Sequence, residues 1–171
     1  MRVLTLALLL VASSAAAQQP AAVIPESARA DSVPAPPPPP SPEQLRYLDG
    51  LKTVGRGVAQ LKDGVTRVAN AGGDTTKLKL AGRRLGGLCG AARGFMTSGR
   101  TKMQPAAYAD STQVRARKLT VQIDTLVRGA GRCESSAPRE TDSTAAGLLA
   151  QLRAYEAALR DFRAAIGLPN R

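Results

Sequence analysis

Apolar residues recur at alternating spacings of three and four along four segments of this chain, and this pattern constrains the fold more than any other feature. The first segment, after Ser41, carries Tyr47, Leu51, Val54, Val58, Leu61, Val65 and Val68. The second begins near Asp74 and carries Leu78, Ala81, Leu85, Leu88, Ala92 and Phe95. The third begins at Pro105 and carries Thr112, Ala116, Leu119, Ile123, Leu126 and Ala130. The fourth follows Thr141 and carries Ala145, Leu148, Leu152, Tyr155, Leu159, Phe162 and Ile166. Each spacing places its residues on one side of an α-helix.

Residues that start and stop helices flank these segments. Ser41 followed by Pro42 predicts the start of the first helix, and Gly167 followed closely by Pro169 predicts the end of the fourth. Four amphipathic helices joined by short connections predict an all-α fold, an antiparallel four-helix bundle of up-down-up-down topology over residues 43–171.

Glycines recur within the predicted helices at regular intervals. Gly50, Gly57 and Gly64 are seven residues apart, and Gly82, Gly86, Gly90 and Gly94 are four apart. Each glycine inside a helix costs about 0.5–1 kcal/mol relative to alanine. The regular spacing therefore predicts ridges at which helices approach each other closely.

The N-terminal region is typical of an exported protein. A positive start at Arg2, an apolar run over residues 3–12 and small residues up to Ala17 predict a signal peptide over 1–17, cleaved after Ala17. The proline-rich segment 18–42 predicts a disordered, extended linker. We expect localisation in the periplasm or outside the cell, and no transmembrane segment in the mature chain.

The chain contains no histidine, which removes the usual general base, the usual haem ligand and the commonest zinc ligand. The carboxylates fall beside the apolar stripes, and we expect them to pair within their own helices, for example Asp49 with Lys52 and Glu156 with Arg160. We therefore expect a protein that is not an enzyme and that holds no metal and no cofactor.

Cys89 and Cys133 are the only cysteines, and an intramolecular disulfide is the default expectation for an exported chain. The hairpin expected between the second and third helices argues against this disulfide. If the chain reverses at residues 99–104 and the third helix ends near Gly129, the two cysteines lie about 20 Å or more apart, whereas a disulfide needs Cα atoms within about 7 Å. Either the connection 129–140 climbs back along the bundle, or the third helix ends early, or the cysteines stay free or pair between chains. A bridge within the chain would contribute roughly 3–4 kcal/mol.

The formal net charge is +11, and basic residues gather where acidic ones are missing. Between residues 75 and 109 there is no acidic residue, and the basic residues are Lys77, Lys79, Arg83, Arg84, Arg93, Arg100 and Lys102. They lie off the apolar stripe, which predicts a basic face that binds anions. A surplus of arginine can equally reflect the composition of a GC-rich genome, and then the face is only solvated.

The expected partners of this face are anionic lipid headgroups or acidic envelope glycan. Nucleic acid fits less well, because the face lacks interleaved aromatic residues and an exported protein rarely meets nucleic acid. The leading hypothesis is an exported, non-enzymatic binding or structural module of the envelope. Two others remain open: a carrier of a small apolar ligand in the bundle core, and a homo-oligomeric assembly module joined through the glycine ridges.

Overall fold

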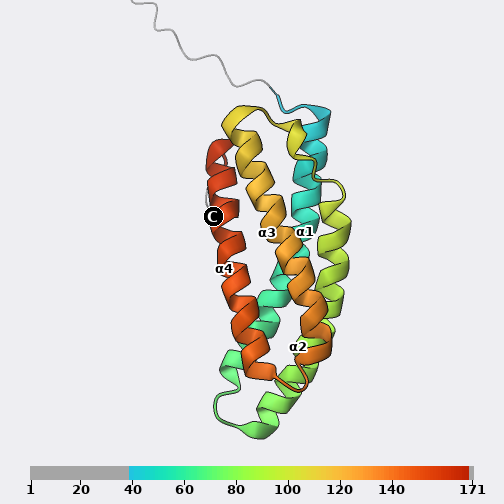
Figure 1. Ribbon diagram of the computed structural model, residues 1–171, viewed down its shortest axis with the longest axis vertical. Helices are drawn as coiled ribbons and strands as arrows, with labels where there is room; N and C mark the ends of the chain where they lie inside the picture. The colour runs from blue at the N-terminus through green and yellow to red at the C-terminus, as the bar shows by residue number, and fades with distance from the viewer. Residues whose placement is uncertain (1–38, 170–171) are drawn as a thin grey trace, which may run out of the picture. The chain divides into compact units, whose positions relative to one another are not determined.

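The computed structural model describes residues 39–169, which are all-helical and contain no strand. The helices are α1 (Pro42–Asn70), α2 (Thr75–Arg100), α3 (Asp110–Ser136) and α4 (Thr141–Ala165), and one turn of 3-10 helix, η2 (Pro105–Ala107), lies between α2 and α3. Figure 1 shows the four long helices lying alongside one another, an arrangement compatible with the predicted helical bundle. The predicted signal peptide and residues 18–38 of the predicted linker lie outside the described residues.

The first two helices begin at side-chain caps. The hydroxyl of Ser41 accepts a hydrogen bond from the Gln44 amide (3.2 Å), and the Gln44 side chain accepts one from the Ser41 amide (2.9 Å). The Asp74 carboxylate accepts hydrogen bonds from the amides of Thr76 (2.9 Å) and Lys77 (3.0 Å). These contacts satisfy amides that have no partner inside the helix, so both predicted helix starts are confirmed.

The predicted apolar stripes pack into one core. Its largest fully buried side chains include Tyr47, Val54, Leu61, Leu85, Met96, Leu119, Ile123, Leu126 and Phe162. The prediction for the second helix is wrong at its end, because Phe95 is 37% exposed and Met96 is completely buried. A straight α-helix drifts by about 20° per heptad relative to a strict seven-residue repeat. After two heptads, the residue four positions beyond Ala92 therefore faces the core in place of Phe95.

Most of the predicted glycine ridges lie at contacts between helices. A Cβ on Gly50 would lie 2.6 Å from the carbonyl oxygen of Gly99, and one on Gly57 would lie 2.7 Å from that of Ala92. In α2, Gly82, Gly86 and Gly90 approach residues 134–141, whereas Gly94 faces open space. The ridges are therefore occupied by neighbouring helices of the same chain, which explains why side chains are missing there.

Along the length of the bundle, the start of α3 is offset from the end of α2. The last residue of α2, Arg100, pairs with Asp124 and not with the first turn of α3. The stretch from Asp110 to Asp124 corresponds to about 20 Å of helix at 1.5 Å per residue. The connection over residues 101–109, which we call the long link, therefore runs along the bundle before α3 starts, as Figure 1 shows.

This offset corrects the expected hairpin. The third helix starts at Asp110 and not at Pro105, and it continues through Gly129 to Ser136. It continues because Ala130 and Cys133 extend its buried stripe, and burial of side chains outweighs the helix-weakening effect of glycine. The segment that climbs along the bundle is thus the long link and not the connection 129–140.

Candidate anion-binding face

The seven basic residues of the predicted anion-binding face lie on α2 and at the start of the long link. Arg100 and Lys102 are partly buried, and the other five are exposed. Four of the seven form ion pairs: Lys77 with Asp74 (3.7 Å), Arg93 with Glu134 (3.5 Å), Arg100 with Asp124 (2.9 Å) and Lys102 with Asp49 (2.7 Å). Their charges are therefore already balanced in part by carboxylates of the same chain.

Two of these ion pairs lie where α2 passes into the long link: one joins the end of α2 to α3, and the other joins the link to α1. The Nε and Nη2 atoms of Arg100 donate to both carboxylate oxygens of Asp124 (2.9 and 3.2 Å), and Nη1 donates to the Met103 carbonyl (3.2 Å). The Lys102 ammonium donates to Asp49 on α1 and holds the pKa of that carboxyl below its usual value. Asp49 therefore pairs with the long link and not with Lys52 of its own helix as expected.

Glu156 departs from expectation in the same way, because it pairs with Lys62 of α1 and not with Arg160 of its own helix. Spacing within one helix identifies side chains that could pair. Which carboxylate is used depends on the neighbouring helix.

The remaining three basic residues, Lys79, Arg83 and Arg84, are exposed and make no ion pair with another residue between 39 and 169. Lys79 and Arg83 are one helical turn apart, as are Leu80 and Arg84, so each pair lies on one side of α2. Leu80 is 51% exposed. We call Lys79, Leu80, Arg83 and Arg84 the outer face of α2. It combines three unpaired cations with a large apolar side chain, Leu80, which is not among the residues of the predicted anion-binding face.

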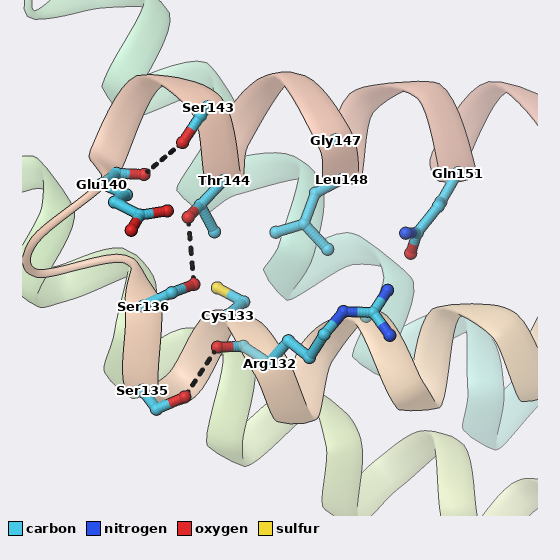
Figure 2. A pocket seen from close by; sticks show the side chains of 11 residues that line it. Arg132, Cys133, Ser135, Ser136, Glu140, Ser143, Thr144, Gly147, Leu148 and Gln151 are labelled. Carbon is cyan, nitrogen blue, oxygen red and sulfur yellow. Dashed lines mark hydrogen bonds between the residues drawn. The ribbon is translucent and has the colours of Figure 1, made fainter.

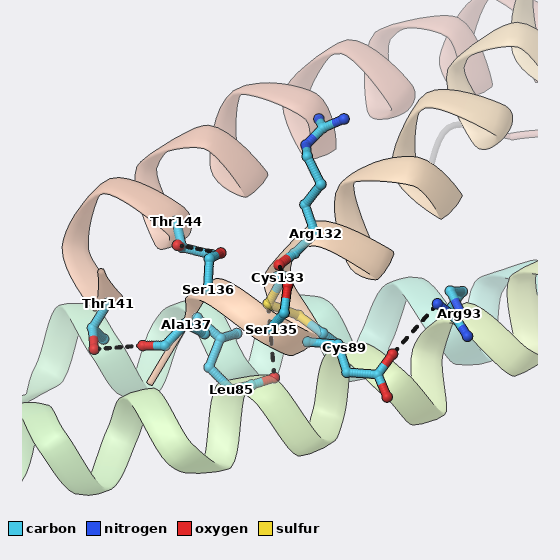
Figure 3. The surroundings of a disulfide bond; sticks show 11 residues. Leu85, Cys89, Arg93, Arg132, Cys133, Ser135, Ser136, Ala137, Thr141 and Thr144 are labelled. Atoms are coloured by element: carbon cyan, nitrogen blue, oxygen red, sulfur yellow. Dashed lines mark hydrogen bonds and ion pairs between the residues drawn. A yellow bond between two sulfur atoms is a disulfide. The ribbon is translucent and has the colours of Figure 1, made fainter. Parts of the chain in front are cut away.

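The structure brings Cys89 and Cys133 together. Their Sγ atoms are 2.09 Å apart and their Cα atoms 6.0 Å apart, a pair at disulfide distance that joins α2 to α3. In Figure 3, Arg93, which pairs with Glu134, lies on one side of the cysteines, and the hydrogen bond from Thr141 to the Ala137 carbonyl (2.8 Å) lies on the other. Both cysteines are buried. The geometry fits a bridge within the chain.

A pocket of about 430 Å³ with both polar and apolar lining atoms lies between the end of α3 and the start of α4. Figure 2 shows Arg132 and Glu140 among the side chains that line it, with Ser136 and Thr144 hydrogen-bonded to each other at 3.0 Å. Gly147 also lines it, and a Cβ there would meet no atom within 4 Å. Sequence reasoning missed this pocket, which small residues on both helices leave open. Its lining mixes polar and apolar atoms, whereas a carrier of an apolar ligand is expected to have an apolar cavity in its core.

Residues 39–169 show neither a metal-binding cluster nor a membrane-spanning helix. They hold no group of three or more histidine, cysteine, aspartate or glutamate side chains placed to bind a metal ion. In the same range, no helix combines the length and the apolar character needed to cross a membrane.

Comparison with known proteins gave no match, whether to a protein-family model, to a curated protein or to a solved structure.

Proposed function

We propose that this chain is an exported, non-enzymatic helical-bundle protein of the cell envelope, and that the outer face of α2 binds anionic lipid headgroups or acidic glycan. The observation that carries the proposal is the exposure of Lys79, Arg83 and Arg84 without a carboxylate partner among the described residues. Near an anionic membrane surface, each lysine or arginine contributes about 1 kcal/mol of binding free energy. Three together correspond to an affinity gain on the order of 100-fold, because 1.4 kcal/mol is a factor of ten.

The apolar member of this face favours lipid over glycan. Leu80 is half exposed and lies one helical turn before Arg84. An apolar side chain gains free energy when it enters the boundary between headgroups and acyl chains, while neighbouring cations stay with the phosphates. Glycan offers hydroxyl groups and no comparable apolar layer.

The proposal keeps the finer architecture predicted from the sequence: an up-down-up-down bundle, a signal peptide removed after Ala17, and a site of action in the periplasm or outside the cell. Contacts between α1 and α2 support the topology, because Gly50 lies by Gly99 and Gly57 by Ala92, in opposite order along the two helices. The pair of cysteines at disulfide distance supports an oxidising compartment.

The test is co-sedimentation of the chain beginning at Gln18 with anionic and with neutral lipid vesicles, at low and at physiological salt. We expect binding to anionic vesicles only, and weaker binding as salt rises, because exposed charges are screened. The triple variant Lys79→Ala, Arg83→Ala, Arg84→Ala should bind on the order of 100-fold more weakly.

A matched control removes three other charges. Arg46, Arg153 and Arg160 are also exposed and form no ion pair with a described residue, but they lie on α1 and α4. Their triple alanine variant has the same net charge as the α2 variant and should lose little binding. If both variants lose binding equally, net charge and not the outer face of α2 is responsible, and the proposal fails.

A further inference from the structure

Two adjoining hollows lie along the seam between α1 and α2, next to the outer face of α2. One, of about 240 Å³, is lined by residues that include Ala71, Leu80 and Ala81, and the other, of about 440 Å³, by residues that include Gly87 and Leu88. Arg67 and Arg84 line both hollows. Because they share these two side chains, we refer to the two hollows together as the α1–α2 groove. The larger hollow has the size of pockets that hold small ligands.

The residues that line the groove are of two chemical kinds. Ala71, Leu80, Ala81 and Leu88 are apolar, and Arg67, Lys77 and Arg84 are cationic. A ligand that fits both kinds has an apolar chain attached to an anionic group.

The cations that line the groove are not equally available to a ligand. Arg67 pairs with Asp63 at 2.8 Å, so the one carboxylate that lines the groove is already balanced by its neighbour. Lys77 lies 3.7 Å from Asp74, a long ion pair. Arg84 pairs with no carboxylate among residues 39–169. The groove thus presents one uncompensated guanidinium, which can form paired hydrogen bonds with a phosphate.

Gly87 keeps the second hollow open. A Cβ at this position would meet no atom within 4 Å, although the residue is in the middle of α2. Glycine in an exposed helical position costs about 1 kcal/mol relative to alanine. At Gly87, no neighbouring helix lies close enough to exclude a side chain. The missing side chain instead leaves space beside Leu88.

We propose that the α1–α2 groove accommodates one acyl chain of an anionic phospholipid, with the phosphate against Arg84 and Lys77. This inference rests on the proposed function and specifies how the bound lipid is held. The apolar chain lies over Leu80, Ala81 and Leu88, and the headgroup stays exposed to solvent.

The test uses dihexanoyl phosphatidylglycerol below its micellar concentration, so that single lipids and not a surface are presented. Isothermal titration calorimetry should detect saturable binding to the full mature chain. Glycerophosphoglycerol, which has the same headgroup and no acyl chains, should bind at least tenfold more weakly, as should dihexanoyl phosphatidylcholine, whose headgroup has no net charge.

A pair of glycine variants locates the binding. Gly87→Leu fills the groove, and Gly94→Leu adds the same side chain one heptad further along α2, where a Cβ also meets no atom within 4 Å. Neither variant changes the charge, and both should fold, since leucine favours a helix more than glycine does. We expect Gly87→Leu to lower the affinity for the short-chain lipid at least tenfold and Gly94→Leu to leave it unchanged.

The same variants separate this inference from the proposed function. Gly87→Leu keeps Lys79, Arg83 and Arg84, so it should still bind anionic vesicles at low salt. If vesicles bind but the short-chain lipid does not, or if both leucine variants bind it like the parent chain, the groove inference is wrong and the proposed function stands. If anionic vesicles do not bind at all, the proposed function itself fails.

Discussion

At the scale of single residues, Gly50 allows the closest approach between α1 and α2 described above. Alanine at this position would place its Cβ 2.6 Å from the Gly99 carbonyl oxygen and 2.8 Å from Met103. Both distances are shorter than van der Waals contact, so the two helices would have to move apart. Overpacking of this kind typically costs 1–3 kcal/mol.

We therefore expect Gly50→Ala to lower the free energy of unfolding by about 1–3 kcal/mol. The control is Gly55→Ala in the same helix, where a Cβ meets no atom within 4 Å. That variant should gain about 0.5–1 kcal/mol from higher helix propensity. Urea unfolding followed by circular dichroism measures both, and equal midpoints for the two variants would contradict the close approach.

Single residues also show where sequence reasoning reached its limit. The seven-residue spacing placed Tyr47, Leu61 and Phe162 correctly in the core. It failed for Phe95 because the exact rotation of α2 depends on accumulated drift over several turns. It also failed to find Leu80, because an apolar residue outside the stripe does not reveal its exposure until the neighbouring helix is placed.

At the scale of elements, the long link is held by aromatic packing as well as by ion pairs. The Tyr108 ring lies 5.2 Å from the ring of Tyr47 on α1 and 5.2 Å from that of Phe162 on α4, between ring centroids. Its hydroxyl oxygen is buried and has no hydrogen-bond partner among the described residues. The ring, and not the hydroxyl, therefore attaches the link to the bundle.

Two substitutions at Tyr108 should therefore differ sharply. Tyr108→Ala removes the ring and should lower the free energy of unfolding by about 3 kcal/mol, as for other buried aromatic side chains. Tyr108→Phe removes only an unsatisfied hydroxyl and should leave stability unchanged or slightly higher. Trypsin cleavage after Lys102 should become faster in the alanine variant alone. Faster cleavage in the phenylalanine variant as well would mean that the hydroxyl has a partner.

The helix boundaries also show which parts of the fold are determined by residues close together in the sequence. The starts of α1 and α2 follow from Ser41 and Asp74, because a capping side chain acts within three residues of itself. The start of α3 at Asp110 cannot be inferred from neighbouring residues in the same way, because the path of the long link depends on contacts with α1, α3 and α4. Expectations based on a short hairpin therefore misplaced α3 along the bundle.

At the scale of the whole molecule, the bond between Cys89 and Cys133 would close a loop with a sequence separation of 44. The chain-entropy account of disulfides gives about 4 kcal/mol of stabilisation for a loop of this length. Native stabilities of domains are typically only 5–15 kcal/mol, so this bond would supply a large share.

We expect the purified mature chain to contain no free thiol, and reductant to lower the free energy of unfolding by about 4 kcal/mol. Thiol labelling under denaturing conditions measures the first, and urea unfolding with and without reductant measures the second. The double variant Cys89→Ala, Cys133→Ala should resemble the reduced protein and should not respond to reductant. A parent chain with two reactive thiols would refute the bridge.

The offset of α3 has a topological consequence. Of the three connections between the described helices, only the long link lies between Cys89 and Cys133, inside the ring that the bond would close. A single cut after Lys102 would then leave two fragments tethered through sulfur, which migrate as one species on a gel until a reductant separates them. The long link, which sets the offset of α3, is thus the one of these three connections at which the backbone could be cut without separating the molecule into two pieces.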